Sequence, residues 1–177
     1  MKKNKALFLD RDGVINVDCG YVYQINKFEF IDGIFRLVKK AKDNGYHVLI
    51  ITNQAGIGRG LYTEKDFEKL MSWVKTKFIE NNGFIDDIFF SPFHPVHGIG
   101  YYKQDSDCRK PNPGMILKAA EKYNINLSNS ILVGDNITDA EAGKKAGVRT
   151  NIIYNNDITS KHNYFSVAKI DEVIDYL

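Results

Sequence analysis

The sequence has few cysteines and no long apolar run, and both shortages exclude classes of protein. Two cysteines in 177 residues, Cys19 and Cys108, are too few for a disulfide scaffold. No apolar run reaches the ~20 residues that a membrane-spanning helix needs, and the N-terminal stretch lacks the apolar core of a secretion signal. We therefore expect a cytoplasmic protein with reduced thiols and no membrane partner.

The chain also has little net charge. It carries 24 Lys and Arg residues against 22 Asp and Glu residues, a formal net charge of +2. Proteins that bind nucleic acid usually present a strongly basic surface, so we expect no nucleic-acid partner. The sequence contains no internal repeat, linker or low-complexity segment, and 177 residues is a typical length for one domain. We expect a single domain, residues 1–177, that is a monomer.

Strand-like apolar runs alternate with stretches of helical periodicity. Strands are predicted at residues 6–9, 46–51, 88–90, 130–133 and 150–154. Helices are predicted after the N-cap residues Asp32, Thr63 and Asn112, at about residues 138–146, and at residues 168–177. This alternation predicts an α/β fold whose mostly parallel sheet is covered by helices on both faces.

Polar side chains directly follow three of the predicted strands. Asp10 and Asp12 follow the first strand, Thr52 follows the second, and Asp135 follows the fourth. Because the carboxyl ends of parallel strands lie at one edge of a sheet, these groups should converge despite their separation in sequence. Lys110, just before a predicted helix, could add positive charge there. Carboxylates, a hydroxyl and a lysine together suit a divalent cation and a phosphate group.

As a set, these stretches resemble the four motifs of the haloacid dehalogenase superfamily of phosphatases. The matching residues are Asp10-Arg-Asp-Gly-Val, Thr52-Asn-Gln, Lys110 and Gly134-Asp135-Asn-x-x-Asp139. Each motif alone has an ordinary structural explanation, so the resemblance depends on finding all four in this order. It implies a Rossmann-like sheet of five parallel strands in the order 5-4-1-2-3, with Mg²⁺ at the carboxyl edge. A non-catalytic Mg²⁺- or phosphate-binding module is disfavoured because the catalytic motif residues are intact.

The resemblance also implies a role for each residue. Asp10 would be the nucleophile that takes the phosphoryl group. Asp12 would protonate the leaving oxygen and then deprotonate the attacking water. Thr52 and Lys110 would hold the phosphoryl oxygens. Asp10, Asp135 and the backbone carbonyl of Asp12 would bind Mg²⁺.

Many members of this superfamily choose their substrate with an inserted cap domain, for which this chain has no room. Only residues 13–51, which number 39, separate Asp12 from Thr52, and a helix and a strand use about half of them. The interval from Gln54 to Lys110 must also supply a helix, a strand and loops. We therefore expect a capless domain with an open site, whose substrate selectivity lies in short loops.

The loops resemble those of the heptose bisphosphate phosphatases, a capless branch of the superfamily. The similar stretches are residues 15–22, 54–60 and 108–114. The resemblance implies a small sugar bisphosphate as substrate and loss of its 7-phosphate. The residues that would contact this substrate are Asp18, Cys19, Gly20, Tyr21, Asn53, Gln54, Ala55 and Arg109. The guanidinium of Arg109 is suited to hold the phosphate that does not react.

Several alternatives stay open at this stage. The histidinol-phosphate phosphatases share the four motifs and the loop arrangement, although the residues at 18–21 and 56–60 favour the heptose branch. Arg59 is either a solvated loop residue or a second phosphate contact. Asp139 is expected to orient the catalytic groups or to belong to the metal shell, and the role of Asn136 is undecided.

The chain departs from its relatives at two points, of which one is Asn136, where some relatives carry lysine. The other is the loop before Arg109. Many of them hold the loop before Arg109 with a zinc ion bound by a Cys-x-His and a Cys-x-Cys pair. The corresponding positions here are Ser91, Phe93, Ser106 and Cys108. Serine and phenylalanine are not zinc ligands, so we expect Mg²⁺ as the only metal and no structural Zn²⁺. Packing of Phe93, Tyr101 and Tyr102 onto the domain is expected to hold this loop instead.

Overall fold

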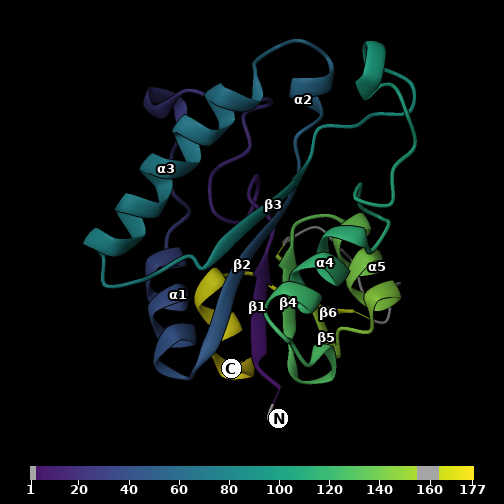
Figure 1. The fold of residues 1–177 in the computed structure, drawn as a ribbon. Helices are drawn as coiled ribbons and strands as arrows, with labels where there is room; N and C mark the ends of the chain where they lie inside the picture. Colours follow the sequence, from purple (N-terminus) through teal and green to yellow (C-terminus); the bar gives the residue numbers. More distant parts are fainter. Residues whose placement is uncertain (1–2, 155–163) are drawn as a thin grey trace.

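The computed structural model describes residues 3–154 and 164–177, which alternate between strands and helices as predicted (Figure 1). The strands are β1 (Lys5–Leu9), β2 (Tyr46–Asn53), β3 (Asp87–Ser91), β4 (Ile131–Gly134), β5 (Thr150–Tyr154) and β6 (Phe165–Val167). The α-helices are α1 (Ile34–Asp43), α2 (Ala55–Gly58), α3 (Glu64–Glu80), α4 (Gly114–Lys122) and α5 (Ile137–Ala146). Short 3₁₀ helices are η1 (Ile25–Lys27), η2 (Gly100–Tyr102), η3 (Leu127–Asn129) and η4 (Ile170–Tyr176).

The described strands form one parallel sheet in the order β3-β2-β1-β4-β5-β6. The predicted order 5-4-1-2-3 is therefore confirmed for five strands, but the predicted sheet was one strand short. The sixth strand, β6, pairs with β5 and has only three residues, too few for a detectable alternation of apolar and polar positions. In the centre of the sheet, Leu9 of β1 is opposite Ile50 of β2 and Val133 of β4.

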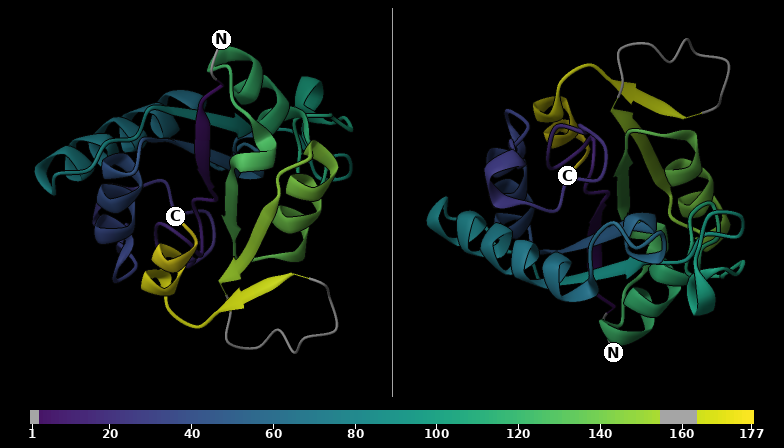
Figure 2. Two further views of the ribbon diagram at one scale, coloured as in Figure 1. Left: turned by 90° about the horizontal axis from the view of Figure 1, so that it is seen from below. Right: turned by 90° about the horizontal axis from the view of Figure 1, so that it is seen from above.

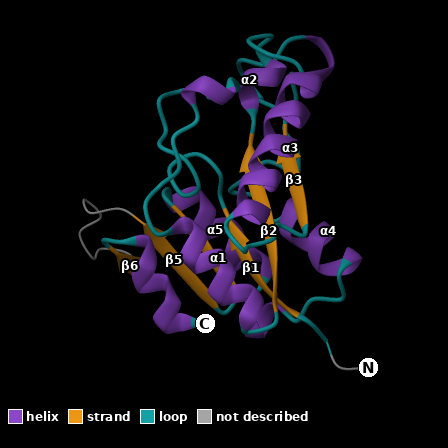
Figure 3. Cartoon of the chain, turned by 90° about the vertical axis from the view of Figure 1, so that its left-hand side faces the viewer, coloured by secondary structure: helices purple, strands orange, loops and turns teal. Residues whose placement is uncertain are grey.

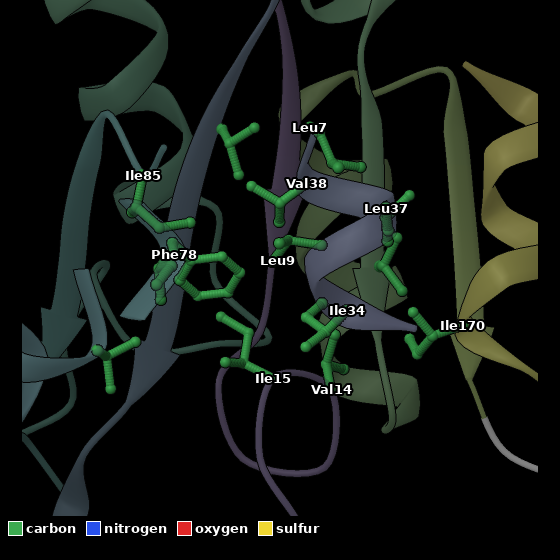
Figure 4. Packing of buried hydrophobic residues seen from close by; sticks show 14 of the residues in the cluster. Leu7, Leu9, Val14, Ile15, Ile34, Leu37, Val38, Phe78, Ile85 and Ile170 are labelled. Atoms are coloured by element: carbon green, nitrogen blue, oxygen red, sulfur yellow. The ribbon is translucent and has the colours of Figure 1, made fainter. Parts of the chain in front are cut away.

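Helices cover both faces of the sheet. Alternate residues of each strand point to opposite faces, so each strand contributes side chains to both layers of packing. Leu7 and Leu9 of β1 pack with residues of α1, α3 and η4, and Figure 4 shows this packing around Leu37, Val38 and Ile170. Ala6 and Phe8 face the other side, where they pack with residues of α4 and α5. Figure 2 shows α1 and η4 on one side of the sheet and α4 and α5 on the other. Each fully buried leucine contributes roughly 1.5–3 kcal/mol to this three-layer arrangement.

The helix boundaries confirm some predictions and correct others. Thr63 caps α3 in a capping box with Asp66, as predicted. Helix α1 instead has Gly33 as its N-cap, since the predicted cap Asp32 lies in solvent with its carboxylate 3.7 Å from Arg36 Nη2. Helix α4 begins at Gly114 after the N-cap Pro113, because the side chain of Asn112, the predicted cap, donates to the carbonyl oxygen of Ser106 instead.

The C-terminal helix is also shorter and tighter than predicted. Residues 170–176 form the 3₁₀ helix η4 in place of a helix over 168–177, and its Ile170 and Val173 are buried as expected. In the part of the chain that the structure describes, no helix combines the length and the apolar character required to cross a membrane.

The loops that matter for function lie at the carboxyl end of the sheet. In Figure 3, several of these loops surround α2, at the end opposite the N-terminus. They include residues 10–24, which follow β1, and residues 92–113, which follow β3. The carboxyl edge of the sheet is therefore the region to examine for a site.

Candidate active site

The carboxyl ends of β1, β2 and β4 bring the predicted catalytic residues together. The backbone N–H of Asp10 donates to the carbonyl oxygen of Val133 at 2.9 Å, which fixes the end of β1 against β4. A cavity of about 180 Å³ opens at this point. Its lining residues are Asp10, Asp12, Asp18, Thr52, Asn53, Lys110, Asp135, Asn136, Thr138 and Asp139. The structure thus gathers Asp10, Asp12, Thr52, Lys110 and Asp135, as the motifs predict.

Lys110 lies between two carboxylates. Its Nζ is 2.8 Å from Asp10 Oδ1 and 2.5 Å from Asp139 Oδ1, and it also donates to the carbonyl oxygen of Ile51 at 3.0 Å. The residue is 4% exposed. Burial alone would lower the pKa of Lys110, but Asp10 and Asp139 outweigh burial and raise that pKa. The ammonium group therefore stays charged and faces the cavity beside Asp10.

Three carboxylates lie close together around this lysine. Oxygen atoms of Asp10, Asp135 and Asp139 lie within 4.8 Å of one another. Burial raises the pKa of Asp10 to about 8, an effect that Lys110 opposes and Asp139 reinforces. Burial, with a contribution from Asp139, also raises the pKa of Asp135 to about 6. We call these three aspartates and Lys110 the strand-end cluster.

The strand-end cluster fits a hard divalent cation. Its donors are carboxylate oxygens, the ligands that Mg²⁺ prefers. Burial, reinforced by the neighbouring carboxylate of Asp139, raises the pKa of Asp10 and of Asp135, and a bound cation would favour their charged forms. Asp139 is already engaged, since its Oδ1 meets Lys110 and its Oδ2 accepts the backbone N–H of Asn136 at 3.0 Å. Asp10 and Asp135 are therefore the better candidates for metal ligands, and Asp139 orients Lys110.

Two glycines allow this close packing. A Cβ on Gly13 would lie 2.2 Å from Asp135 Oδ2, and Gly13 has a left-handed backbone (φ +82°) that other residues rarely adopt. A Cβ on Gly134 would lie 2.1 Å from the Cβ of Asp139. Side chains at these positions would push the carboxylates out of the strand-end cluster.

The side chain of Asp12 is held by three residues. Arg11 Nη2 and Asn16 Nδ2 donate to its Oδ1 at 2.6 and 3.1 Å, and Gln54 Nε2 donates to its Oδ2 at 3.0 Å. Arg11 and Asn16 were not predicted, because no spacing rule marks a single buried polar residue in a loop. The one available signal was a charged residue, Arg11, between the two aspartates of the first motif.

Two of the predicted substrate-binding residues use their side chains for hydrogen bonds within the protein. Gln54 is 1% exposed, and its amide is bound to Asp12, Thr52 and Tyr62, so the geometry leaves it no free donor for a substrate. Asn53 exchanges two hydrogen bonds with the backbone of Lys110, at 3.0 and 3.1 Å. Asn53 lines the cavity but serves mainly to place Lys110.

The other predicted contacts follow β1, β2 and β3 at the carboxyl end of the sheet. Asp18 lines the cavity, and the next residues of its loop, Cys19, Gly20 and Tyr21, are exposed, with Tyr21 at 43% exposure. Ala55 is half-buried at the start of α2. We call residues 18–21, Arg59 and Arg109 the loop rim.

Within the loop rim, the two arginines are tied to neighbouring residues. Arg59 is bonded to the hydroxyl of Tyr21, and its guanidinium carbon lies 5.3 Å from the centre of that ring, so it is not a freely solvated side chain. Arg109 is half-buried, donates to the carbonyl oxygen of Phe93 at 3.1 Å and interacts electrostatically with Tyr21. Asn136, whose role was undecided, lines the cavity and caps α5 through its side chain.

The four positions compared with zinc ligands lie around the loop that follows β3. Ser91 is buried, and Cys108 Sγ accepts a hydrogen bond from Lys118 Nζ at 2.9 Å. His94 Nδ1 accepts the backbone N–H groups of Val96 and His97. The absence of zinc stays a prediction. The expected packing of Tyr101 is wrong, because this side chain is 76% exposed, whereas Tyr102 donates from its hydroxyl to Glu64.

Comparisons with known proteins agree with this geometry. A family model described as HAD-hydrolase-like matches residues 107–177. The chain is 55% identical over 151 residues to a protein of Burkholderia mallei named D-glycero-alpha-D-manno-heptose-1,7-bisphosphate 7-phosphatase, covering 85% of this chain and 80% of that relative. It is 42% identical over 172 residues to a protein of Vibrio cholerae named for the beta form of the same substrate, covering 96% of this chain and 92% of the relative.

A solved structure shares the fold. The D,D-heptose 1,7-bisphosphate phosphatase of B. bronchiseptica, solved with magnesium and phosphate, aligns with a TM-score of 0.83 at 24% sequence identity, covering 97% of this chain and 96% of that one. The sequence relatives, the shared fold and the strand-end cluster all indicate the same family. The chain belongs to the haloacid dehalogenase superfamily and, within it, to the family of heptose-1,7-bisphosphate 7-phosphatases.

Proposed function

We propose that the chain removes the 7-phosphate of D-glycero-D-manno-heptose 1,7-bisphosphate by Mg²⁺-dependent hydrolysis, giving heptose 1-phosphate and inorganic phosphate. The observation that carries this proposal is the strand-end cluster, in which Lys110 and three carboxylates surround one small cavity in a chain 55% identical to a relative of that name. A carboxylate facing a phosphate dianion is repelled, so the site needs positive charge before attack can occur.

The chain's own residues supply the nucleophile and its orientation. Oδ1 of Asp10 accepts hydrogen bonds from Lys110 Nζ and from the backbone N–H of Arg11, both at 2.8 Å. These two bonds fix the plane of the carboxylate, from which one oxygen attacks the phosphorus atom. The bond between phosphorus and the C7 oxygen then breaks, leaving an aspartyl-phosphate on Asp10.

Asp12 is assigned to proton transfer. In the first displacement it donates its proton to the departing C7 oxygen, and in the second it takes a proton from the water that attacks the aspartyl-phosphate. That attack breaks the bond between phosphorus and Asp10, releases phosphate and restores both carboxyl groups. The cavity position of Asp12, 22% exposed at its side chain, allows it to reach both the leaving oxygen and water.

Positive charge and a hydroxyl stabilise the transferring group. Lys110 Nζ contributes one ammonium charge beside Asp10. Thr52 Oγ1 already accepts a hydrogen bond from Gln54 Nε2 at 2.8 Å, so its own hydrogen is directed to another acceptor, which we assign to a phosphoryl oxygen. A Mg²⁺ ion held by Asp10, Asp135 and the backbone carbonyl of Asp12 supplies the remaining charge neutralisation when bound.

The loop rim is assigned to substrate choice. Arg109 is placed to hold the phosphate on C1, and residues 18–21 to contact the sugar. We propose that the chain acts through one capless domain, in which short loops replace a cap, and that it is a monomer. No structural zinc is part of this proposal, and elemental analysis of chelator-washed protein showing one zinc per chain would contradict that point.

The test of the substrate is a comparison of kcat/KM values. The alpha and beta anomers of heptose 1,7-bisphosphate should both be compared with histidinol phosphate, the substrate of the nearest alternative family. We expect at least one heptose anomer to be preferred. A preference for histidinol phosphate would overturn the assignment, and the ratio between anomers would decide which of the two named relatives this chain follows.

A further inference from the structure

The carboxylate of Asp12 is held in place by donors on both oxygens. Arg11 and Asn16 donate to Oδ1, and Gln54 donates to Oδ2. This is more contact than a solvent-facing carboxylate needs, and it leaves the group little freedom to rotate. A residue that must reach a leaving oxygen in one step and a water in the next benefits from such a fixed orientation.

Gln54 is itself oriented by Tyr62. The Tyr62 hydroxyl donates to Gln54 Oε1 at 2.6 Å, so the amide nitrogen must point the opposite way, toward Asp12 Oδ2 and Thr52 Oγ1. Because Oε1 accepts the hydrogen of Tyr62, the two hydrogens of the amide nitrogen are the ones directed at Asp12 and Thr52. Burial raises the pKa of Tyr62 to about 12, so its hydroxyl keeps its proton and remains the donor.

Packing fixes the ring of Tyr62. It stacks on Tyr23 with ring centres 5.0 Å apart and planes 11° from parallel. A Cβ on Gly56 would lie 2.2 Å from Tyr62 Cε1, so the ring rests directly on the backbone of α2. Tyr62 and Gln54 are therefore a rigid pair behind Asp12.

Arg11 bonds the other carboxylate oxygen of Asp12, Oδ1, and its burial is energetically unfavourable. It is 0% exposed, and among the described residues its Nε and Nη1 have no hydrogen-bond acceptor. Burying a guanidinium with incomplete pairing is unfavourable, and an apolar side chain of similar volume would usually pack there at least as well. Its Nη2, however, bonds both Asp12 and the carbonyl oxygen of Val22. The contact with Asp12 is therefore a better explanation for Arg11 than stability.

We propose that Tyr62, Gln54, Arg11 and Asn16 are positioning residues that aim Asp12 at the leaving oxygen. This inference rests on the proposed function, because it requires Asp12 to act as the proton donor. It gives Gln54 a role behind the proton donor in place of a contact with the substrate. None of the four residues needs to touch the substrate.

The principal test is Tyr62→Phe, which removes one hydroxyl and keeps the ring stack. We expect kcat/KM to fall about tenfold for a sugar phosphate, whose alkoxide leaving group needs a proton from Asp12. For p-nitrophenyl phosphate, whose leaving group departs without a proton, the fall should be less than about twofold. Since kcat/KM reports only the steps through formation of the aspartyl-phosphate, the later role of Asp12 as base does not enter the comparison.

Two further variants separate positioning from general damage. Tyr23→Phe removes a hydroxyl from the partner ring of the stack and should leave both kcat/KM values unchanged. In an Asp12→Ala background, Tyr62→Phe should have no further effect on either substrate, because the residue through which it acts is gone. Gln54→Met also removes the donor to Thr52 Oγ1, so it should lower kcat/KM on both substrates, with the larger loss on the sugar phosphate.

Equal losses on both substrates, no loss on either, or an undiminished effect in the Asp12→Ala background would each overturn the positioning role. Thermal unfolding of every variant confirms that folded proteins are compared. Failure of the proposed function is distinguishable, because it would appear in the unmutated chain as an absence of sugar-phosphate hydrolysis. Parallel losses in an active enzyme overturn the positioning role alone.

Discussion

The strand-end cluster and the loop rim are both polar, yet they are built in opposite ways. In the strand-end cluster, Lys110 and Asp139 are buried and Asp10 is half-buried. Lys110 pairs with both carboxylates where β1 ends beside α5. In the loop rim, Tyr21 and Arg59 are exposed and bonded mainly to each other. The first arrangement is rigid and electrostatically strained, whereas the second is open and adaptable.

This difference separates reaction from selection. Charges that must act on any phosphate group are fixed by the sheet, whose backbone does not depend on the substrate. Groups that recognise one sugar are placed on loops, which tolerate change without disturbing the core. Substitutions in the strand-end cluster should therefore affect every substrate, and substitutions in the loop rim should affect some substrates more than others.

The largest effect should come from Asp10→Asn. An amide cannot serve as the nucleophile, so kcat should fall by at least about 10⁴-fold on all phosphate esters. Steady-state hydrolysis of heptose bisphosphate and p-nitrophenyl phosphate measures it. The same chemical change at exposed Asp32, Asp32→Asn, is the control and should leave kcat unchanged. Near-normal activity of Asp10→Asn would refute the mechanism.

The second largest loss of kcat should come from Lys110→Met. Loss of the ammonium group beside Asp10 should lower kcat about 10²–10³-fold on every substrate, as removal of one preorganised charge usually does. The melting temperature should fall as well, because the carboxylates lose their buried partner. Lys122→Met removes a surface lysine that pairs with Asp87 and should change neither quantity measurably. A loss confined to one substrate would place Lys110 with the loop rim.

Asp135→Asn tests whether the strand-end cluster is strained without metal. A carboxyl whose pKa is about 6 when folded and ~3.9 when unfolded holds its proton more tightly in the folded chain. In chelator, the contribution of Asp135 to stability should therefore be fully present below about pH 4 and be lost as the pH rises through 6. At pH 7.5 without metal, Asp135→Asn should stabilise the chain by about 1 kcal/mol, while abolishing the rise in melting temperature on adding Mg²⁺.

Thermal unfolding with and without Mg²⁺ measures both effects of Asp135→Asn. The matched control is Asp171→Asn, for which the sign reverses. A hydrogen bond from Arg36 lowers the pKa of Asp171, so its loss should destabilise the folded chain at neutral pH. A destabilised Asp135→Asn protein that still responds to Mg²⁺ would show that Asp135 is not a metal ligand.

The most selective effect should come from Arg109→Gln. Losing a charged contact to the C1 phosphate should raise KM for heptose 1,7-bisphosphate about 10–100-fold, with little change for heptose 7-phosphate, which lacks that group. Steady-state kinetics on the two substrates gives the ratio directly. Exposed Arg149 directly precedes β5, at the edge of the sheet opposite the carboxyl ends, and provides the control Arg149→Gln. Equal effects on both substrates would remove Arg109 from recognition of the C1 phosphate.

The sequence was enough to predict the strand-end cluster. Apolar runs that end in Asp10, Thr52 and Asp135 identify strand ends, and parallel pairing leaves one edge where such ends can meet. The central order of the sheet follows from the resemblance to a known superfamily. Strand β6 was missed because three residues carry no periodicity. The predicted caps Asp32 and Asn112 do not cap α1 and α4, because their side chains interact with Arg36 and with the carbonyl oxygen of Ser106.

The positions of the supporting side chains could not be predicted. Arg11, Asn16 and Tyr62 contact Asp12 directly or through Gln54, but each is a single polar residue in a loop, where no spacing rule applies. Gln54 was predicted to contact the substrate from the resemblance to the heptose branch, but its side chain is buried and bonds Asp12, Thr52 and Tyr62. Sequence motifs thus predict which groups react more readily than which groups hold them.

The central place of β1 has a consequence for biosynthesis. Its residues pair with β2, which starts at Tyr46, and with β4, which starts at Ile131, so one edge of β1 gains its partner much later in synthesis than the other. A chain emerging from the ribosome therefore carries an apolar strand with one open edge until β4 has been synthesised. Such non-local pairing favours slow folding and exposes that edge to other chains. The strand that carries Asp10 at its end is thus also a strand whose edge stays exposed during synthesis.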